Sequence, residues 1–139
     1  MSTEPIARGS CHCGRARFEI TGPISGFLHC HCATCRKING TTHGSSAVVA
    51  AEHFHVTSDT GDLAAYESSP GKRRYFCASC GAHIYAAKDW APDIVLLRMG
   101  TLDTPFDIRP ERHIWVSHKP DWYDILDDLP QDAEQGQGE

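Results

Sequence analysis

The chain has 139 residues, 40% of them hydrophobic and 22% charged, which is the size and composition of one globular domain with a sizeable core. The formal net charge of −5 argues against nucleic acid and anionic membranes as partners. The sequence shows no signal peptide and no apolar stretch long enough for a transmembrane helix, so we expect a cytoplasmic protein.

Short segments rich in Val, Ile, Phe and Tyr, separated by turn residues, predict a single mostly-β domain over residues 1–130. The predicted strands, in chain order, are 16–20, 27–30, 46–51, 54–57, 64–67, 73–76, 83–86, 94–99 and 113–116. One helical turn is predicted over residues 33–38. Residues 131–139 are rich in Gln, Gly and acidic side chains, and we expect them to form a disordered tail.

The cysteines carry the chemical information in this sequence. They fall into three groups, Cys11-x-Cys13, Cys30-x-Cys32-x-x-Cys35 and Cys77-x-x-Cys80. An odd number of closely spaced cysteines in a reducing compartment indicates metal ligands rather than disulfides.

The first and third groups together predict a closed zinc site. Residues two apart in an extended segment point to the same side, so Cys11 and Cys13 can present both sulfurs to one ion. Cys77 and Cys80 form a CxxC turn followed by Gly81, and this turn brings two further sulfurs together. Four thiolates are typical of a structural, tetrahedral zinc site, although iron remains an alternative for the same ligands.

The second group has no cysteine left to complete it. Cys30, Cys32 and Cys35 therefore predict a second zinc ion with an open fourth position, as in catalytic sites. The alternatives are a redox centre without metal and a closed Cys₃His site. Since His12 and His31 lie between cysteines and point away if extended, the candidates for a fourth ligand are His29, His43 and His83.

At these motifs the sequence resembles the glutathione-dependent formaldehyde-activating (Gfa) family, also called the centromere-protein-V-like family. The resemblance rests on residues 9–14, 30–37, 76–81, 100–103, 109–110, 113–116, 120–122 and 128–130. It implies an Mss4-like, zinc-stabilised β-sandwich. It also implies two zinc ions, one structural and one catalytic. The structural ligands would be Cys11, Cys13, Cys77 and Cys80, and the catalytic ligands Cys30, Cys32 and Cys35.

The resemblance also implies an activity, that of a zinc-dependent carbon–sulfur lyase joining glutathione to formaldehyde, with a small thiol and an aldehyde as partners. Residues 40–46 depart from the common family pattern, which predicts a more polar pocket. His43 is a candidate acid or base there, and Arg36 and Lys37 are candidate contacts for a substrate carboxylate. The alternatives are a non-catalytic zinc-binding interaction or chaperone-like module of the same fold and a zinc or redox buffer.

Overall fold

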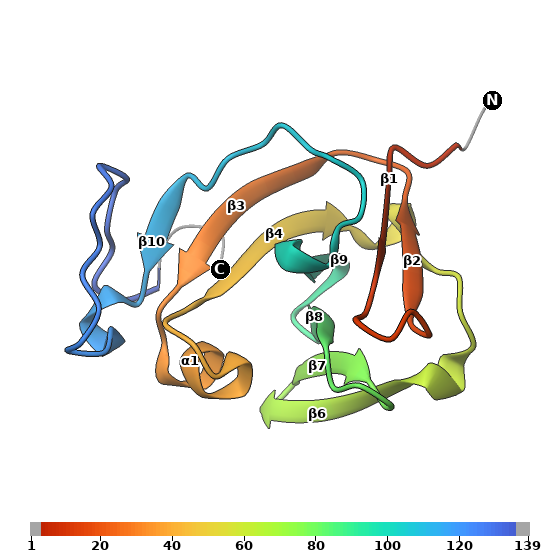
Figure 1. Ribbon diagram of the computed structural model, residues 1–139, viewed down its shortest axis with the longest axis horizontal. Helices are drawn as coiled ribbons and strands as arrows, with labels where there is room; N and C mark the ends of the chain where they lie inside the picture. The colour runs from red at the N-terminus through yellow and green to blue at the C-terminus, as the bar shows by residue number, and fades with distance from the viewer. Residues whose placement is uncertain (1–3, 136–139) are drawn as a thin grey trace.

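The structure of the protein, a computed structural model, describes residues 4–135 and is built mainly from two β-sheets (Figure 1). The smaller sheet is antiparallel in the order β1-β2-β5, with β1 (Ala7–Ser10), β2 (Arg17–Ile20) and β5 (Phe54–Val56). Figure 1 shows β1 and β2 at one end of the molecule and β10 at the other.

The larger sheet has the strand order β10-β3-β4-β9-β8-β7-β6. Only β10 pairs in parallel, with β3, and the other described pairs are antiparallel. Its strands are β3 (Ile24–Cys30), β4 (Gly44–Ala50), β6 (Leu63–Ser69), β7 (Lys72–Cys77), β8 (His83–Lys88), β9 (Ala91–Arg98) and β10 (Arg112–Ile114). The helix α1 (Ala33–Asn39) connects β3 to β4.

The predicted mostly-β fold class is confirmed, and each predicted strand corresponds to a strand of the structure. Sequence reasoning missed β1, whose small residues include Gly9. That glycine allows a close approach, because a Cβ atom there would lie 2.1 Å from Cζ of Phe18. The last predicted strand ends earlier than expected, since Trp115 adopts a left-handed backbone conformation with φ of 58° and begins a 3₁₀ turn.

The core lies between the small sheet and one face of the large sheet. Phe18 and Ile20 of β2 and Val49 and Leu97 of the large sheet are buried there. Phe54 stands 5.1 Å from the Phe18 ring and continues the contact to the large sheet. Burying this apolar surface fixes the β1–β2 turn against the large sheet.

The opposite face of the large sheet is cationic. Cross-strand partners point to the same side, and the register pairs Lys72 with Lys88, Arg74 with Ala86, and Arg98 with Ser46. Strand pairing continues from β8 through β9 and β4 to β3, which ends at Cys30. These side chains and that of Cys30 therefore lie on the same face of the sheet. We call Lys72, Arg74, Lys88 and Arg98 the cationic face.

Of the segment 131–139, for which disorder is predicted, the structure describes residues 131–135 in contact with the β10 region, and residues 136–139 lie outside the described residues. Gln131 forms a parallel bridge with His113, and Asp132 forms an ion pair with Arg112. The N–H of Trp115 donates to the Glu134 carbonyl at 2.9 Å. The edge of β10 and the turn after it therefore provide hydrogen-bond partners for residues 131–134. The amino-acid composition of this segment does not predict these contacts.

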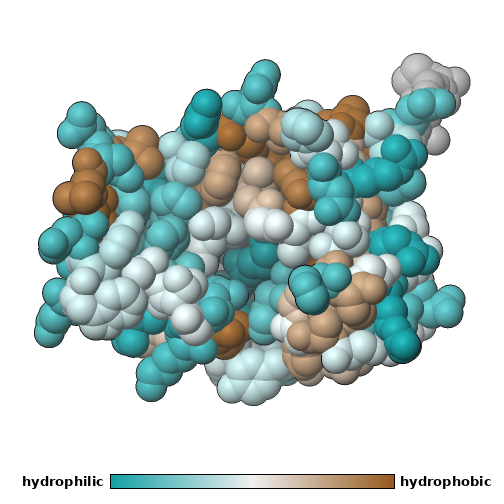
Figure 2. Space-filling view, viewed as in Figure 1, coloured by the Kyte–Doolittle hydropathy of each residue, from teal (hydrophilic) through white to brown (hydrophobic). Residues whose placement is uncertain are grey.

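Figure 2 shows hydrophobic groups at several separate places on the visible face, with hydrophilic groups between them. Within residues 4–135, no helix has the length and apolar character needed to cross a membrane.

Candidate functional site

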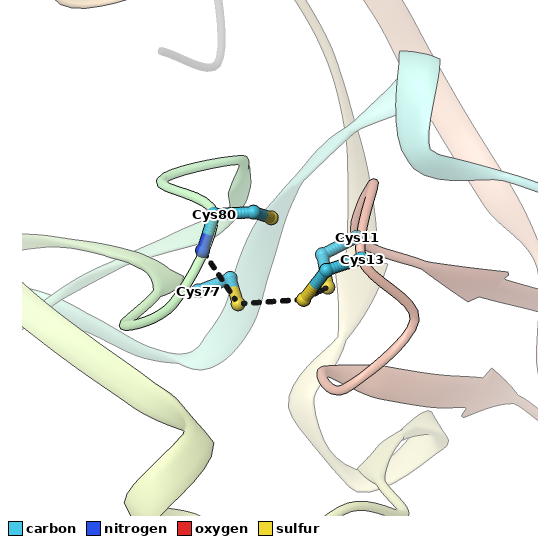
Figure 3. A group of neighbouring side chains, drawn as sticks. All are labelled: Cys11, Cys13, Cys77 and Cys80. Atoms are coloured by element: carbon cyan, nitrogen blue, oxygen red, sulfur yellow. Dashed lines mark hydrogen bonds between the residues drawn. The ribbon is translucent and has the colours of Figure 1, made fainter.

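The predicted four-cysteine cluster forms between two facing loops (Figure 3). Cys11 and Cys13 come from the β1–β2 turn, while Cys77 ends β7 and Cys80 lies in the turn that follows. The sulfurs of Cys11 and Cys13 are 3.5 Å apart, and those of Cys13 and Cys77 are 3.7 Å apart. All four Sγ atoms lie within 4.8 Å of one another, so they can hold one metal ion.

Backbone amides converge on these sulfurs. The N–H groups of Ser79 and Cys80 each donate to the Sγ of Cys77 at 3.4 Å, and the N–H of Ala16 donates to the Sγ of Cys11 at 3.3 Å. Gly81 closes the CxxC turn with φ of 80°, a conformation that favours glycine. A set of four thiols, two of them buried, with such donors fits a structural zinc ion.

Two exposed thiols of this cluster differ in acidity. Hydrogen bonds with the backbone, that at Ala82 foremost, lower the pKa of Cys80 to about 6. For Cys13 a backbone hydrogen bond at Arg15 lowers the pKa, but desolvation and the other three thiols of the cluster outweigh it and raise the pKa to about 11.

We therefore expect iodoacetamide to modify Cys80 before Cys13 in the metal-free protein at pH 7, by roughly tenfold or more, because the thiolate is the reactive form. Peptide mass spectrometry after short exposure measures the two rates. Both side chains are exposed, so access does not distinguish them. Equal rates would contradict the assigned difference in pKa.

The second cluster lies where β3 meets α1. Cys30 ends β3, Cys32 caps the helix by accepting the N–H of Cys35 at 3.3 Å, and Cys35 lies in its first turns. The three Sγ atoms lie within 4.8 Å of one another. Gly44 lets α1 approach β4 closely beside this cluster, since a Cβ atom there would stand 3.1 Å from Nδ2 of Asn39.

Among residues 4–135, no histidine nitrogen joins these three sulfurs to make a four-ligand group. His29 alternates with Cys30 along β3 and so points to the other side. There it contacts His43, with ring centroids 4.3 Å apart, and His31 bonds to His113 at 2.9 Å. The structure therefore places His43 in a histidine cluster behind the thiols.

Arginine side chains of the cationic face stand beside the second cluster. Nη1 of Arg74 lies 3.7 Å from the Sγ of Cys35, and its Nε donates to Ser68 at 2.8 Å. Hydrogen bonds with the thiols of Cys30 and Cys32, followed by the charge of Arg74, lower the pKa of Cys35. Cys35 is thus prepared to supply thiolate, the form that binds metal, whereas the neighbouring thiols raise the pKa of Cys30.

A cavity of about 340 Å³ opens beside the three sulfurs. Its wall contains Lys72, Arg74 and Lys88 of the cationic face, the rings of Trp90 and Trp115, and His118. The remaining lining residues are Cys30, Cys32, Ala33, Thr34, Cys35, Ser68, Ser69 and Gln135. No carboxylate side chain belongs to this described lining, so its charged side chains at neutral pH include lysine and arginine but no Asp or Glu.

The family described as "Glutathione-dependent formaldehyde-activating enzyme" matches residues 6–118 of this chain. The chain belongs to this family. A Halomonas elongata relative, named "Putative glutathione-dependent formaldehyde-activating enzyme", is 32% identical over 131 residues, covering 86% of this chain and 81% of that protein. The resemblance seen in the sequence is therefore confirmed.

A crystal structure of a Rhodobacter sphaeroides protein shares the fold, with a TM-score of 0.59 and 19% sequence identity. The match covers 72% of this chain and 91% of that one. This agrees with the Mss4-like architecture expected of a Gfa family member.

Sequence reasoning on this Gfa family member found the thiols but not the rest of the pocket. Arg36 and Lys37, the candidate carboxylate contacts, are not among its described lining residues. Arg74, Lys88 and His118 are, and they lie on strands and a turn far in sequence from Cys30, Cys32 and Cys35. For Arg74 the sequence signal was its alternation with Lys72 along one strand.

Proposed function

We propose that the protein is a carbon–sulfur lyase of the S-(hydroxymethyl)glutathione synthase type, joining a glutathione-like thiol to formaldehyde and cleaving the adduct in reverse. One observation carries this proposal. Three thiols converge beside a cavity, and no fourth protein ligand among the described residues closes the group. An open three-ligand site is typical of catalytic rather than structural zinc.

The reaction is balanced without an oxidant or reductant. The thiolate sulfur attacks the carbon of formaldehyde, a carbon–sulfur bond forms, and the C=O π electrons move to oxygen. The proton lost by the thiol is the one that the oxygen needs, so the product is the hydroxymethyl thioether. The uncatalysed addition is already easy, and orienting the two reactants is the main contribution required.

Cys30, Cys32 and Cys35 would hold the metal in this proposal. Zinc bound there would supply a Lewis acid that favours the thiolate form of an incoming thiol. Arg74 contacts the sulfur of Cys35, and its positive charge limits the build-up of negative charge in the cluster. The four-cysteine cluster would hold the second, structural zinc ion.

His118 is the candidate hydrogen-bond donor to the new oxygen. Its Nδ1 accepts the N–H of Ala33 at 3.4 Å, so the ring's N–H is on Nε2. The ring lines the cavity, where this N–H can donate a hydrogen bond to the oxygen on which negative charge develops, while the proton lost by the thiol reaches that oxygen. We propose that His118, rather than the candidate His43, assists the reaction.

The proposal is tested by the rate at which ¹³C-formaldehyde exchanges with its glutathione adduct, followed by NMR. We expect zinc-loaded protein to accelerate the exchange above the uncatalysed rate, and the Cys32→Ser protein, which keeps the four-cysteine cluster, not to do so. An unchanged rate with two zinc ions bound per chain would overturn the lyase and favour a zinc-binding interaction module. We place the reaction in the cytoplasm, where free thiols remain reduced.

A further inference from the structure

The pocket beside the three thiols contains more buried positive charge than the thiols would balance. Arg74 and Lys88 line it as buried cations, and no Asp or Glu does so among the described residues. Three thiolates and one divalent metal ion would leave the cluster with one negative charge, against two buried positive charges in the wall. A buried excess of cations is unfavourable unless a ligand supplies anions.

The cations are not equivalent. Arg74 is committed to Cys35 and Ser68 by hydrogen bonds. Lys88 is only 6% exposed, and its ammonium group lies 5.7 Å from the centroid of the Trp90 ring. Within residues 4–135 this ammonium group forms no ion pair with a carboxylate and no hydrogen bond. Lys88 is therefore a nearly buried cation that lines the cavity and has no anionic partner among these residues.

We infer that Lys88 is the anchor for a substrate carboxylate, so that the pocket selects small thiols that carry a carboxylate group over neutral or cationic ones. The inference rests on the proposed function, because it assumes that a thiol enters beside Cys30, Cys32 and Cys35. A carboxylate on Lys88 makes a charge-assisted hydrogen bond in a largely desolvated position, where such bonds are strongest. The Trp90 and Trp115 rings offer apolar contact to the carbon chain between sulfur and carboxylate.

The test compares three thiols of similar length, 3-mercaptopropionate, 3-mercapto-1-propanol and cysteamine. Their binding to zinc-loaded protein is measured by calorimetry at one pH and ionic strength. We expect the acid to bind at least ten times more tightly than the alcohol, and cysteamine to bind most weakly. Loss of the Lys88 charge in Lys88→Gln should abolish the preference for the acid while leaving the alcohol's affinity unchanged within a factor of about three.

Two further variants separate charge from structure. Lys88→Arg keeps the charge and should retain most of the preference for the acid. Lys37→Gln removes a lysine of α1 that is exposed and outside the pocket lining, and should bind all three thiols like the parent. Zinc content and circular dichroism of each sample establish that the variants are folded and loaded.

The outcomes distinguish this inference from the proposed function. Equal affinity of the parent protein for the acid and the alcohol would overturn the role of Lys88 and leave the lyase proposal standing. So would an equal loss of both affinities in Lys88→Gln. Absence of binding by every thiol to a protein with two zinc ions would overturn the proposed function and this inference together.

Discussion

Replacing Cys77 by Ser should destabilise the whole domain, lowering the free energy of unfolding by about 3 kcal/mol or more. Cys77 is fully buried, belongs to the main core, and accepts the N–H groups of Ser79 and Cys80. Its cluster joins the turn of the small sheet to a turn of the large one. Structural zinc contributes its binding free energy directly to folding, so the loss of one ligand weakens both sheets at their junction.

Thermal unfolding and zinc content of purified Cys77→Ser measure this effect. Ser79→Ala is the matched control, because Ser79 lies exposed in the same turn and its hydroxyl makes one long contact, 3.5 Å from Arg15. Its change should stay within about 0.5 kcal/mol of the parent. A Cys77→Ser protein that unfolds like the parent would contradict a structural role for the four-cysteine cluster.

Replacing Cys32 by Ser should abolish catalysed adduct exchange and thiol binding while the protein stays folded with one zinc ion instead of two. The sulfur of Cys32 has two tasks, as a candidate metal ligand and as the cap that accepts the N–H of Cys35. Serine performs the second task well, since it is a favoured N-cap residue. It supplies no thiolate, so the metal would be lost while α1 keeps its cap, and stability should change by no more than about 1 kcal/mol.

The control for this variant is Thr34→Ser, which changes an exposed residue of α1 that lines the same cavity and retains all seven thiols. It should keep both metal ions and the exchange activity. Global unfolding of Cys32→Ser under conditions where Thr34→Ser is folded would show that the three-cysteine cluster is structural. Full exchange activity in Cys32→Ser would place the reaction elsewhere in the molecule.

The two thiol clusters could be predicted from the sequence because the spacing of neighbouring cysteines largely decides which sulfurs lie together. Cys11 and Cys13 lie two residues apart, and Cys77 and Cys80 enclose one tight turn, so each pair is already preorganised by its spacing. Cys30, Cys32 and Cys35 lie within six residues of one another and were assigned to one site. The four cysteines that remain are the two pairs, so these were assigned to the other site. The structure brings the same seven thiols into the same two groups.

The rest of the pocket was decided by cross-strand register, which spacing along the chain does not reveal. Lys88 is on the same sheet as Cys30 because β8 pairs with β9, β9 with β4, and β4 with β3. His118 reaches Ala33 through a contact 85 residues apart in sequence. Residues 131–135 are ordered by the edge of β10.

The sequence by itself thus determined the two thiol clusters, the mostly-β class and the family, because those follow from short-range spacing and residue type. The positions of Lys88 and His118 beside the three-thiol cluster depended on which strand edges meet. Burial of the apolar core, which includes Phe18, Ile20, Val49 and Leu97, sets the pairing and register of the strands.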